Sequence, residues 1–161
     1  QKLLIFTKKN KLNIMNEIFI KYLKNGKDLY KITKATTGSA GFDLLAAEEN
    51  NFYIEPNSSK LIKCGFSLQM PKNFEAQVRP RSGLALKNSL TVLNSPGTID
   101  SDYRGEICVI LINHSVEIFK IERGMRIAQI IFKEIPEIIL TEVDTLDSTS
   151  RGSGGFGSTG V

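Results

Sequence analysis

Two carboxylates stand close together in the segment Gly97-Thr98-Ile99-Asp100-Ser101-Asp102-Tyr103-Arg104-Gly105. Asp100 and Asp102 flank a predicted tight turn, and paired carboxylates can hold a metal ion or take a proton from an attacking water. Carboxylates in turns are more often only solvated. The segment is therefore a candidate for acid–base chemistry, and its surroundings must decide between the two interpretations.

A second segment, Pro80-Arg81-Ser82-Gly83-Leu84-Ala85-Leu86-Lys87, places a guanidinium, a hydroxyl and an unhindered backbone amide within a few residues. This combination suits a loop that holds a polyphosphate. It fits equally well a turn into a short helix, predicted over residues 83–87, with Ser82 as its N-cap. Both interpretations stay open from this segment alone.

The chain ends in a glycine- and serine-rich stretch, residues 148–161, whose composition predicts a flexible tail. Arg151 and Phe156 interrupt the glycines. An arginine can pair with phosphate, a phenylalanine can stack on a base, and glycines let backbone N–H groups approach an anion closely. The tail is thus also a candidate clamp for a ligand.

The elements that must position these segments are predicted to be short strands. From Lys31 onward, apolar runs alternate with turn-forming Pro, Gly, Asn and Ser, and several runs have a period of two residues. Strands are predicted over residues 52–54, 60–69 with a bulge at Gly65, 74–79, 89–93, 106–113, 117–121, 127–133 and 138–143. This pattern predicts an all-β, single-domain barrel or jelly-roll with one short helix.

Length and composition fit one soluble domain, with 161 residues, 41% hydrophobic and 24% charged. No apolar run approaches the ~20 residues of a membrane span, so no membrane role is expected. The net charge of +4 comes from scattered lysines, which favours attraction to polyphosphate over nucleic-acid binding. Cys64 and Cys108 lie in separate apolar segments, so we expect buried, reduced thiols in a cytoplasmic protein.

Three regions follow from these patterns. Residues 1–30 are predicted to form an N-terminal extension with a first strand region, of which residues 1–14 are expected to have no function, and Met15 is a candidate start. Residues 31–147 are predicted to form the β domain, and residues 148–161 the tail. The single histidine, His114, lies outside every motif, and we assign it no function.

Together with two further segments, GSAGFDL at residues 38–44 and RGMRIAQ at residues 123–129, these segments resemble the five motifs of the trimeric dUTPase (deoxyuridine triphosphate nucleotidohydrolase) family in order and spacing. The resemblance spans about residues 36–161. It is most specific in GTIDSDYRG, PRSGLALK and RGSGGFGSTG. One departure is Met125, at a place usually held by an acidic residue, which puts a local salt bridge in doubt but leaves Arg126 and Gln129 in place.

The resemblance implies hydrolysis of dUTP to dUMP and pyrophosphate, which keeps uracil out of DNA and supplies the precursor of dTMP. Asp100 matches the carboxylate that accepts a proton from the water attacking the α-phosphorus. Tyr103 matches the aromatic residue that leaves no room for a ribose 2′-hydroxyl. Asp43 matches the acid that meets the shell of the cofactor Mg²⁺ through water, because this ion takes its direct ligands mainly from substrate phosphates.

The remaining motif positions imply contacts to the nucleotide. Those for uracil are Asn94, Thr98, Ile99 and the backbone of Cys108. Those for the phosphates are Arg81, Ser82, Gly83 and Gln129, with Arg151 and Ser158 at the γ-phosphate and Phe156 over the uracil ring. The resemblance also implies a homotrimer, in which each site takes its first, second and fourth motifs from one subunit, the third from another and the tail from the remaining one.

The two alternatives to dUTP hydrolysis are a deaminase and a catalytically silent module. The dCTP deaminases share the fold and much of the motif order, but Ile110 stands here where they carry a glutamate base. Zinc deaminases fail sooner, because the His-x-Glu and Pro-Cys-x-x-Cys patterns do not occur in the sequence. A catalytically silent member that senses nucleotide or binds protein is the second alternative, although Asp100 and Arg151 are both retained.

Overall fold

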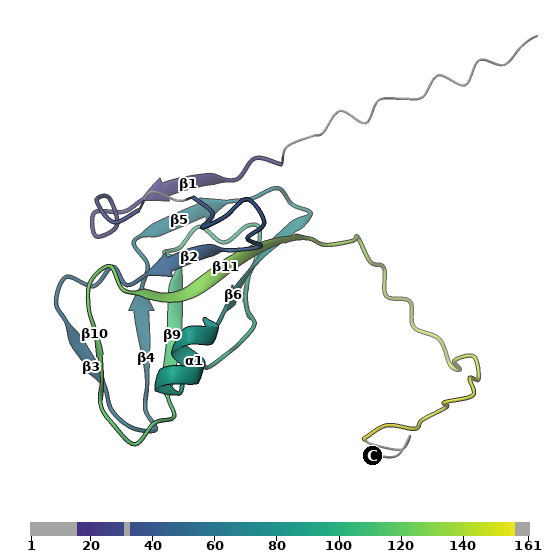
Figure 1. Cartoon of the computed structure of the whole chain (residues 1–161). Coiled ribbons are helices and arrows are strands. Elements are labelled where there is room, and N and C mark those ends of the chain that lie inside the picture. The colour runs from purple at the N-terminus through teal and green to yellow at the C-terminus, as the bar shows by residue number, and fades with distance from the viewer. Residues whose placement is uncertain (1–15, 31–32, 157–161) are drawn as a thin grey trace, which may run out of the picture.

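The structure is a computed structural model that describes residues 16–30 and 33–156 (Figure 1). The predicted leader of residues 1–14 and the predicted phosphate contact Ser158 lie outside these ranges. The described chain forms short strands and one helix, namely β1 (Phe19–Tyr22), β2 (Phe42–Leu45), β3 (Phe52–Ile54), β4 (Ser59–Lys63), β5 (Phe66–Gln69), β6 (Phe74–Arg79), α1 (Ser82–Asn88), β7 (Leu90–Val92), β8 (Gly97–Ile99), β9 (Cys108–Asn113), β10 (Phe119–Ile121) and β11 (Arg126–Glu134).

The strands pair antiparallel in four sheets, with orders β2-β11-β6-β8, β4-β9-β7, β1-β5 and β3-β10. The predicted all-β class is confirmed as a jelly-roll-like arrangement, but within the described ranges the strands do not close into a barrel. The core follows the period-two pattern, since inward positions of β6 and β9 such as Val78 and Leu111 are buried while their neighbours are partly exposed. No helix in the described residues is long and apolar enough to cross a membrane.

The predicted run 60–69 is divided in the structure at Gly65, where β4 ends and β5 begins in a different sheet. Gly65 has a φ of +76°, which disfavours any residue with a Cβ. A Cβ at this position would also lie only 2.4 Å from the Cα of Gly26. The glycine therefore marks a change of sheet with a close backbone contact, where the sequence predicted only a bulge.

The strand predicted over residues 138–143 is wrong. From Ile135, whose N–H donates to the carbonyl of Asn73 at 2.8 Å, the described chain leaves the body and contains no further strand (Figure 1). Ile138, Ile139 and Leu140 are strongly exposed. A strand needs a neighbour to satisfy its backbone groups, and among the described residues no other strand pairs with this segment.

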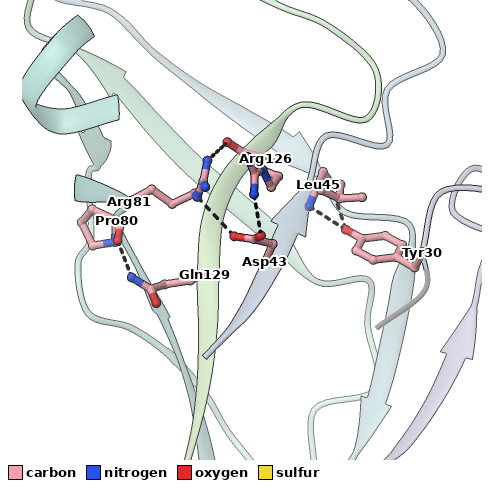
Figure 2. A network of polar contacts seen from close by, with 7 residues as sticks. All are labelled: Tyr30, Asp43, Leu45, Pro80, Arg81, Arg126 and Gln129. Carbon is pink, nitrogen blue, oxygen red and sulfur yellow. Dashed lines mark hydrogen bonds and ion pairs between the residues drawn. The ribbon is translucent and has the colours of Figure 1, made fainter. Parts of the chain in front are cut away.

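The hydroxyl of Tyr30 forms two hydrogen bonds with the backbone of β2 (Figure 2). It accepts from the N–H of Leu45 at 2.8 Å and donates to the carbonyl of the same residue at 3.0 Å. The Tyr30 ring packs edge-on against Phe66, with ring centroids 5.2 Å apart, and burial raises the pKa of the phenol. This contact fixes the strand that carries Asp43.

Tyr30→Phe should lower the free energy of unfolding by about 1–3 kcal/mol, because it leaves partly buried polar groups of Leu45 without this partner. Urea denaturation of the purified protein provides the measurement. Tyr22→Phe is the matched control, since the Tyr22 ring stacks on Tyr30 and its hydroxyl makes no hydrogen bond to the described residues. The control should change stability by less than about 0.5 kcal/mol. Equal losses in the two variants would contradict the role of the Tyr30 hydroxyl.

Candidate active site

A cavity of about 370 Å³ lies where β2, β11 and the start of α1 meet. The register places Asp43 of β2 and Arg79 of β6 on either side of Gln129 of β11, so these side chains project from one face of the sheet. The chain then turns from β6 into α1 at the same edge. The cavity lining consequently joins predicted residues from three motifs, which are Asp43, Arg81, Ser82, Gly83 and Gln129.

The charges in this cavity are arranged around Asp43 (Figure 2). Its two carboxylate oxygens meet Arg81 Nε at 3.2 Å and Arg126 Nη1 at 3.4 Å. Arg81 Nη1 also donates to the carbonyl of Arg126 at 3.1 Å, while Gln129 Nε2 donates to the carbonyl of Pro80 at 2.9 Å. Two guanidinium groups against one carboxylate leave an excess of positive charge, which suits an anion such as phosphate.

The prediction that Ser82 caps the helix is wrong by one residue. Arg81 occupies the N-cap position with extended backbone angles, φ −99° and ψ 126°, and no side-chain hydrogen bond caps the helix. Helical geometry begins at Ser82 because the extended chain that follows β6 continues through Arg81. The Ser82 hydroxyl is therefore not used for capping and lines the cavity.

A second, smaller cavity of about 200 Å³ lies beside the loop that leads from β8 to β9. Its lining contains the predicted residues Thr98, Ile99, Asp100, Tyr103 and Cys108. The predicted turn is present, with the N–H of Tyr103 donating to the carbonyl of Asp100 at 3.2 Å. Arg104 Nη1 braces it by donating to the carbonyls of Ser101 at 2.7 Å and Tyr103 at 2.9 Å.

The ring of Tyr103 lies directly over Gly105. A Cβ added at Gly105 would approach the tyrosine hydroxyl oxygen to 2.2 Å and Cζ to 2.4 Å, so any larger residue there must displace the ring. The hydroxyl donates to the carbonyl of Glu106 at 3.1 Å, and the side chain remains 47% exposed. The tyrosine is therefore a fixed wall of the cavity and not part of the core.

Other predicted residues are placed differently. Asn94 is absent from the lining of the small cavity. Its side chain packs against Gly97, since a Cβ added to Gly97 would lie 3.2 Å from Asn94 Nδ2. Cys108 is half-buried and burial raises the pKa of its thiol, which remains neutral at physiological pH. Cys64 is fully buried, as expected.

Of the predicted tail contacts, Arg151 and Phe156 are described, and both lie outside the lining of the two cavities in this single copy. Arg151 Nε donates to the carbonyl of Gly154 at 2.8 Å, and the ring of Phe156 is fully exposed. Conversely, the structure brings Arg126 and Glu106 to the cavities. Nothing in the sequence singled out Glu106, and Arg126 lay in the fourth motif without an assigned contact. For Arg126 a signal existed, since it stands three residues before Gln129 within the fourth motif.

The two cavities lie at opposite ends of β6. Ile99 pairs with Ala76, so the chain reaches Asp100 beside Glu75, and these two residues line a common surface hollow. Arg81 follows Arg79 at the other end of the strand. At ~3.3 Å per residue, the step from Glu75 to Arg79 alone covers about 13 Å. Within the described residues, the cavities share no lining residue, and one copy does not bring them together.

Comparison with known proteins places these features in a family. The dUTPase family model matches residues 27–160. The deoxyuridine 5'-triphosphate nucleotidohydrolase of Rickettsia bellii is 58% identical over 127 residues, covering 79% of this chain and 85% of that protein. The enzyme of the same name from Rhizobium rhizogenes is 50% identical over 141 residues, covering 86% and 90%. A mutant dUTPase of Staphylococcus bacteriophage 80alpha with dUpNHpp has 25% identity and a TM-score of 0.81, covering 91% of this chain and all of that one.

Proposed function

The chain belongs to the dUTPase family, and on this premise we propose that it is a dUTP diphosphatase, which hydrolyses dUTP to dUMP and pyrophosphate. The observation that carries the proposal is the pair of cavities. One collects Arg81, Ser82, Arg126 and Gln129, which fit a polyphosphate, and the other is a small pocket walled by Tyr103 with Asp100 at its edge. A pyrimidine deoxynucleotide needs both environments.

In the proposed reaction, a water attacks the α-phosphorus in line with the bond to the β-phosphate. Asp100 takes the proton from this water as the new P–O bond forms, and the bond to the bridging oxygen breaks to release pyrophosphate. Arg81 and Arg126 hold the phosphates and balance their charge, which fixes the reacting groups in position. Thr98, Ile99 and the backbone at Cys108 read the uracil edge.

The phosphate cavity also fits a magnesium ion that arrives with its substrate. Among the described residues, Asp43 is the one carboxylate that lines the cavity, and Mg²⁺ is usually held by one or two carboxylates together with substrate phosphates and waters. Asp43 would hold it through water, because both carboxylate oxygens already face guanidinium groups. When bound, the ion supplies charge stabilisation to the phosphates.

We further propose that the active chain is a homotrimer with shared sites. Because Asp100 and Arg81 lie at opposite ends of β6, a complete site requires the small cavity of one copy and the phosphate cavity of another. The tail also supports sharing, since its arginine and aromatic residue reach neither cavity of their own chain. A flexible tail loses its conformational entropy only when nucleotide binds, and it can therefore extend across a neighbour.

The outer face of the β4-β9-β7 sheet is the surface we assign to this contact between copies. Leu61 and Leu93 are 59% and 52% exposed on it, and Leu61 pairs with Ile110 across the sheet. Alternation along β9 places Cys108, Ile110 and Ile112 on this face while Val109 and Leu111 point into the core. A contact here buries exposed apolar groups next to the small cavity.

The other candidate functions find less support. In the structure Ile110 is half-buried on the outer face of β9 and has no group that moves protons, which disfavours a deaminase. A silent nucleotide-binding module would retain the cavities without turnover. Both cysteines are unpaired, which fits the reducing cytoplasm that we propose as its compartment.

The direct test is to incubate the purified chain with Mg²⁺ and, separately, dUTP, dCTP, dTTP or UTP, and to measure pyrophosphate release and the nucleotide product. We expect pyrophosphate and dUMP from dUTP in large excess over the other reactions. Binding of dUTP without turnover would instead establish the silent module, and release of dUTP from dCTP would establish a deaminase.

Gly105→Ala should relax the discrimination against ribose in the same way as Tyr103→Ala, because the added methyl group displaces the tyrosine ring. For each variant we expect the ratio of kcat/KM for dUTP over UTP to fall by about tenfold or more. Steady-state kinetics with both nucleotides measure this ratio. Gly83→Ala is the control, since an added Cβ at Gly83 meets no atom within 4 Å and the residue lies in the other cavity. A normal ratio in Tyr103→Ala would remove the ring from sugar selection.

A further inference from the structure

The carboxylate of Glu106 lies between the small cavity and a turn near the N-terminus. Its Oε1 accepts a hydrogen bond from the N–H of Gly65 at 2.9 Å and another from Asn25 Nδ2 at 2.8 Å. The backbone carbonyl of Glu106 is the acceptor for the Tyr103 hydroxyl. Glu106 thus binds Tyr103, the wall of the cavity, through its backbone carbonyl, and binds Gly65 and Asn25 through its side chain.

The hydrogen bond from the Gly65 N–H to the Glu106 carboxylate takes the place of a backbone hydrogen bond between neighbouring segments. On either side of Gly65 the chain bonds to Ile107, with the N–H of Cys64 donating to the Ile107 carbonyl at 2.9 Å and the N–H of Ile107 donating to the Phe66 carbonyl at 2.8 Å. The N–H of Gly65, turned aside by its positive φ, donates to the Glu106 carboxylate instead. Removing the carboxylate leaves a partly buried donor without this acceptor.

The turn that contains Asn25 is fixed from its other side. Arg123 Nη2 donates to the Asn25 carbonyl at 2.8 Å, and Arg123 Nη1 donates to the carbonyl of Ala47 at 3.1 Å. The backbones of Gly26 and Gly65 are in direct contact, because a Cβ on Gly26 would lie 2.0 Å from the Gly65 carbonyl oxygen. The Glu106 carboxylate is therefore bound to a packed part of the fold.

From these contacts we propose that Glu106 is a positioning residue for the sugar filter, acting through Tyr103. This inference rests on the proposed function as a dUTP diphosphatase. Without the carboxylate, the Glu106 backbone that accepts from the Tyr103 hydroxyl loses its side-chain attachment to Gly65 and Asn25. The backbone hydrogen bonds of Ile107 remain, so the loop stays in place but the tyrosine ring is held less firmly against Gly105. The space beside the deoxyribose then widens. Among the described residues, the Asp100 side chain makes no hydrogen bond with Glu106, so the loss should affect substrate selection more than turnover.

The test compares three variants in the full-length protein with dUTP and UTP as substrates. In Glu106→Ala the ratio of kcat/KM for dUTP over UTP should fall by about tenfold, mainly because kcat/KM for UTP rises, while kcat for dUTP stays within about threefold. Glu106→Gln keeps an oxygen acceptor for both donors and should retain the ratio within about twofold. Glu48→Ala is the matched control, because Glu48 Oε1 accepts from the backbone N–H of Lys63 at 2.9 Å but lies outside the small cavity.

The outcomes separate this inference from the function it rests on. If the unsubstituted chain shows no preference for dUTP over UTP, the proposed function fails. If it shows the preference and Glu106→Ala keeps it, or Glu48→Ala loses it equally, Glu106 is only structural. Should Glu106→Ala fail to fold, Asn25→Asp replaces it, since a second carboxylate facing Glu106 should weaken the same attachment and lower the same ratio. A normal ratio in a folded Asn25→Asp would overturn the proposal.

Discussion

Asp100→Asn should leave the protein folded and able to bind dUTP while turnover falls at least ~10²-fold, the lower end for loss of a general base. The amide has nearly the shape of the carboxylate but does not accept a proton from water at neutral pH. Asp100 is exposed and its side chain makes no hydrogen bond to the described residues, so little stability depends on it. Single-turnover kinetics with dUTP, together with equilibrium binding of a non-hydrolysable analogue, give the two quantities.

Asp102→Asn supplies the matched control for this experiment. It makes the same change of charge two residues away, at a position that is exposed and does not line the small cavity. Its turnover should stay within about tenfold of the unsubstituted protein. Near-normal turnover in a folded Asp100→Asn, or equal losses in both variants, would remove Asp100 from proton transfer.

Two inactive chains should restore activity when they assemble together. One carries Asp100→Asn with its tail intact, and the other ends after Ser150 with Asp100 intact. If each site takes Asp100 and the tail from different copies, every mixed trimer has one site with both parts, whichever chain is present twice. We expect about one third of the activity of a normal trimer from three-fold symmetry. Co-expression with two different affinity tags allows mixed trimers to be isolated and assayed for dUTP hydrolysis.

A second pairing identifies which copy donates the tail. Chains with Arg81→Ala and a full tail are combined with the same truncated chain. If the tail comes from a copy other than the one supplying the phosphate cavity, one site in each mixed trimer again has all its parts. Confirmed mixed trimers that stay inactive in the first pairing would refute sharing of Asp100 and the tail between copies. Inactivity only in the second would assign the tail to the copy with the phosphate cavity.

The all-β class and most strand positions could be predicted from the sequence because apolar alternation and turn residues are local signals. Strands β3 and β6 have the predicted bounds. Strands β2 and β8 were missed since they lie inside the glycine-containing motifs, where strand propensity is low. Residues 138–143 carry a strand-like pattern but have no strand partner in the part of the chain that the structure describes, and a pattern alone does not show whether a neighbouring edge exists.

In the candidate site too, residues within the motifs could be predicted from the sequence, whereas contacts between distant segments could not. The resemblance to the dUTPase motifs implied Asp43, Arg81 and Gln129, and the structure places them in one cavity. Arg126 should project to the opposite face from Gln129 in a regular strand, but the register shifts between Arg126 and Ala128, and the guanidinium reaches Asp43. The attachment of Glu106 to Asn25 joins segments 81 residues apart, and no periodic pattern records such a contact.

The distance between the two cavities along β6 has a genetic consequence. If sites are shared as proposed, each chain supplies a different part to each of the three sites in its trimer. A chain that has lost Asp100 disables one site in the company of two normal chains, whereas a chain that has lost both Asp100 and its tail disables two. As pure homotrimers, these two variants are both inactive. In a cell that also makes the normal chain, the second is the more strongly dominant allele.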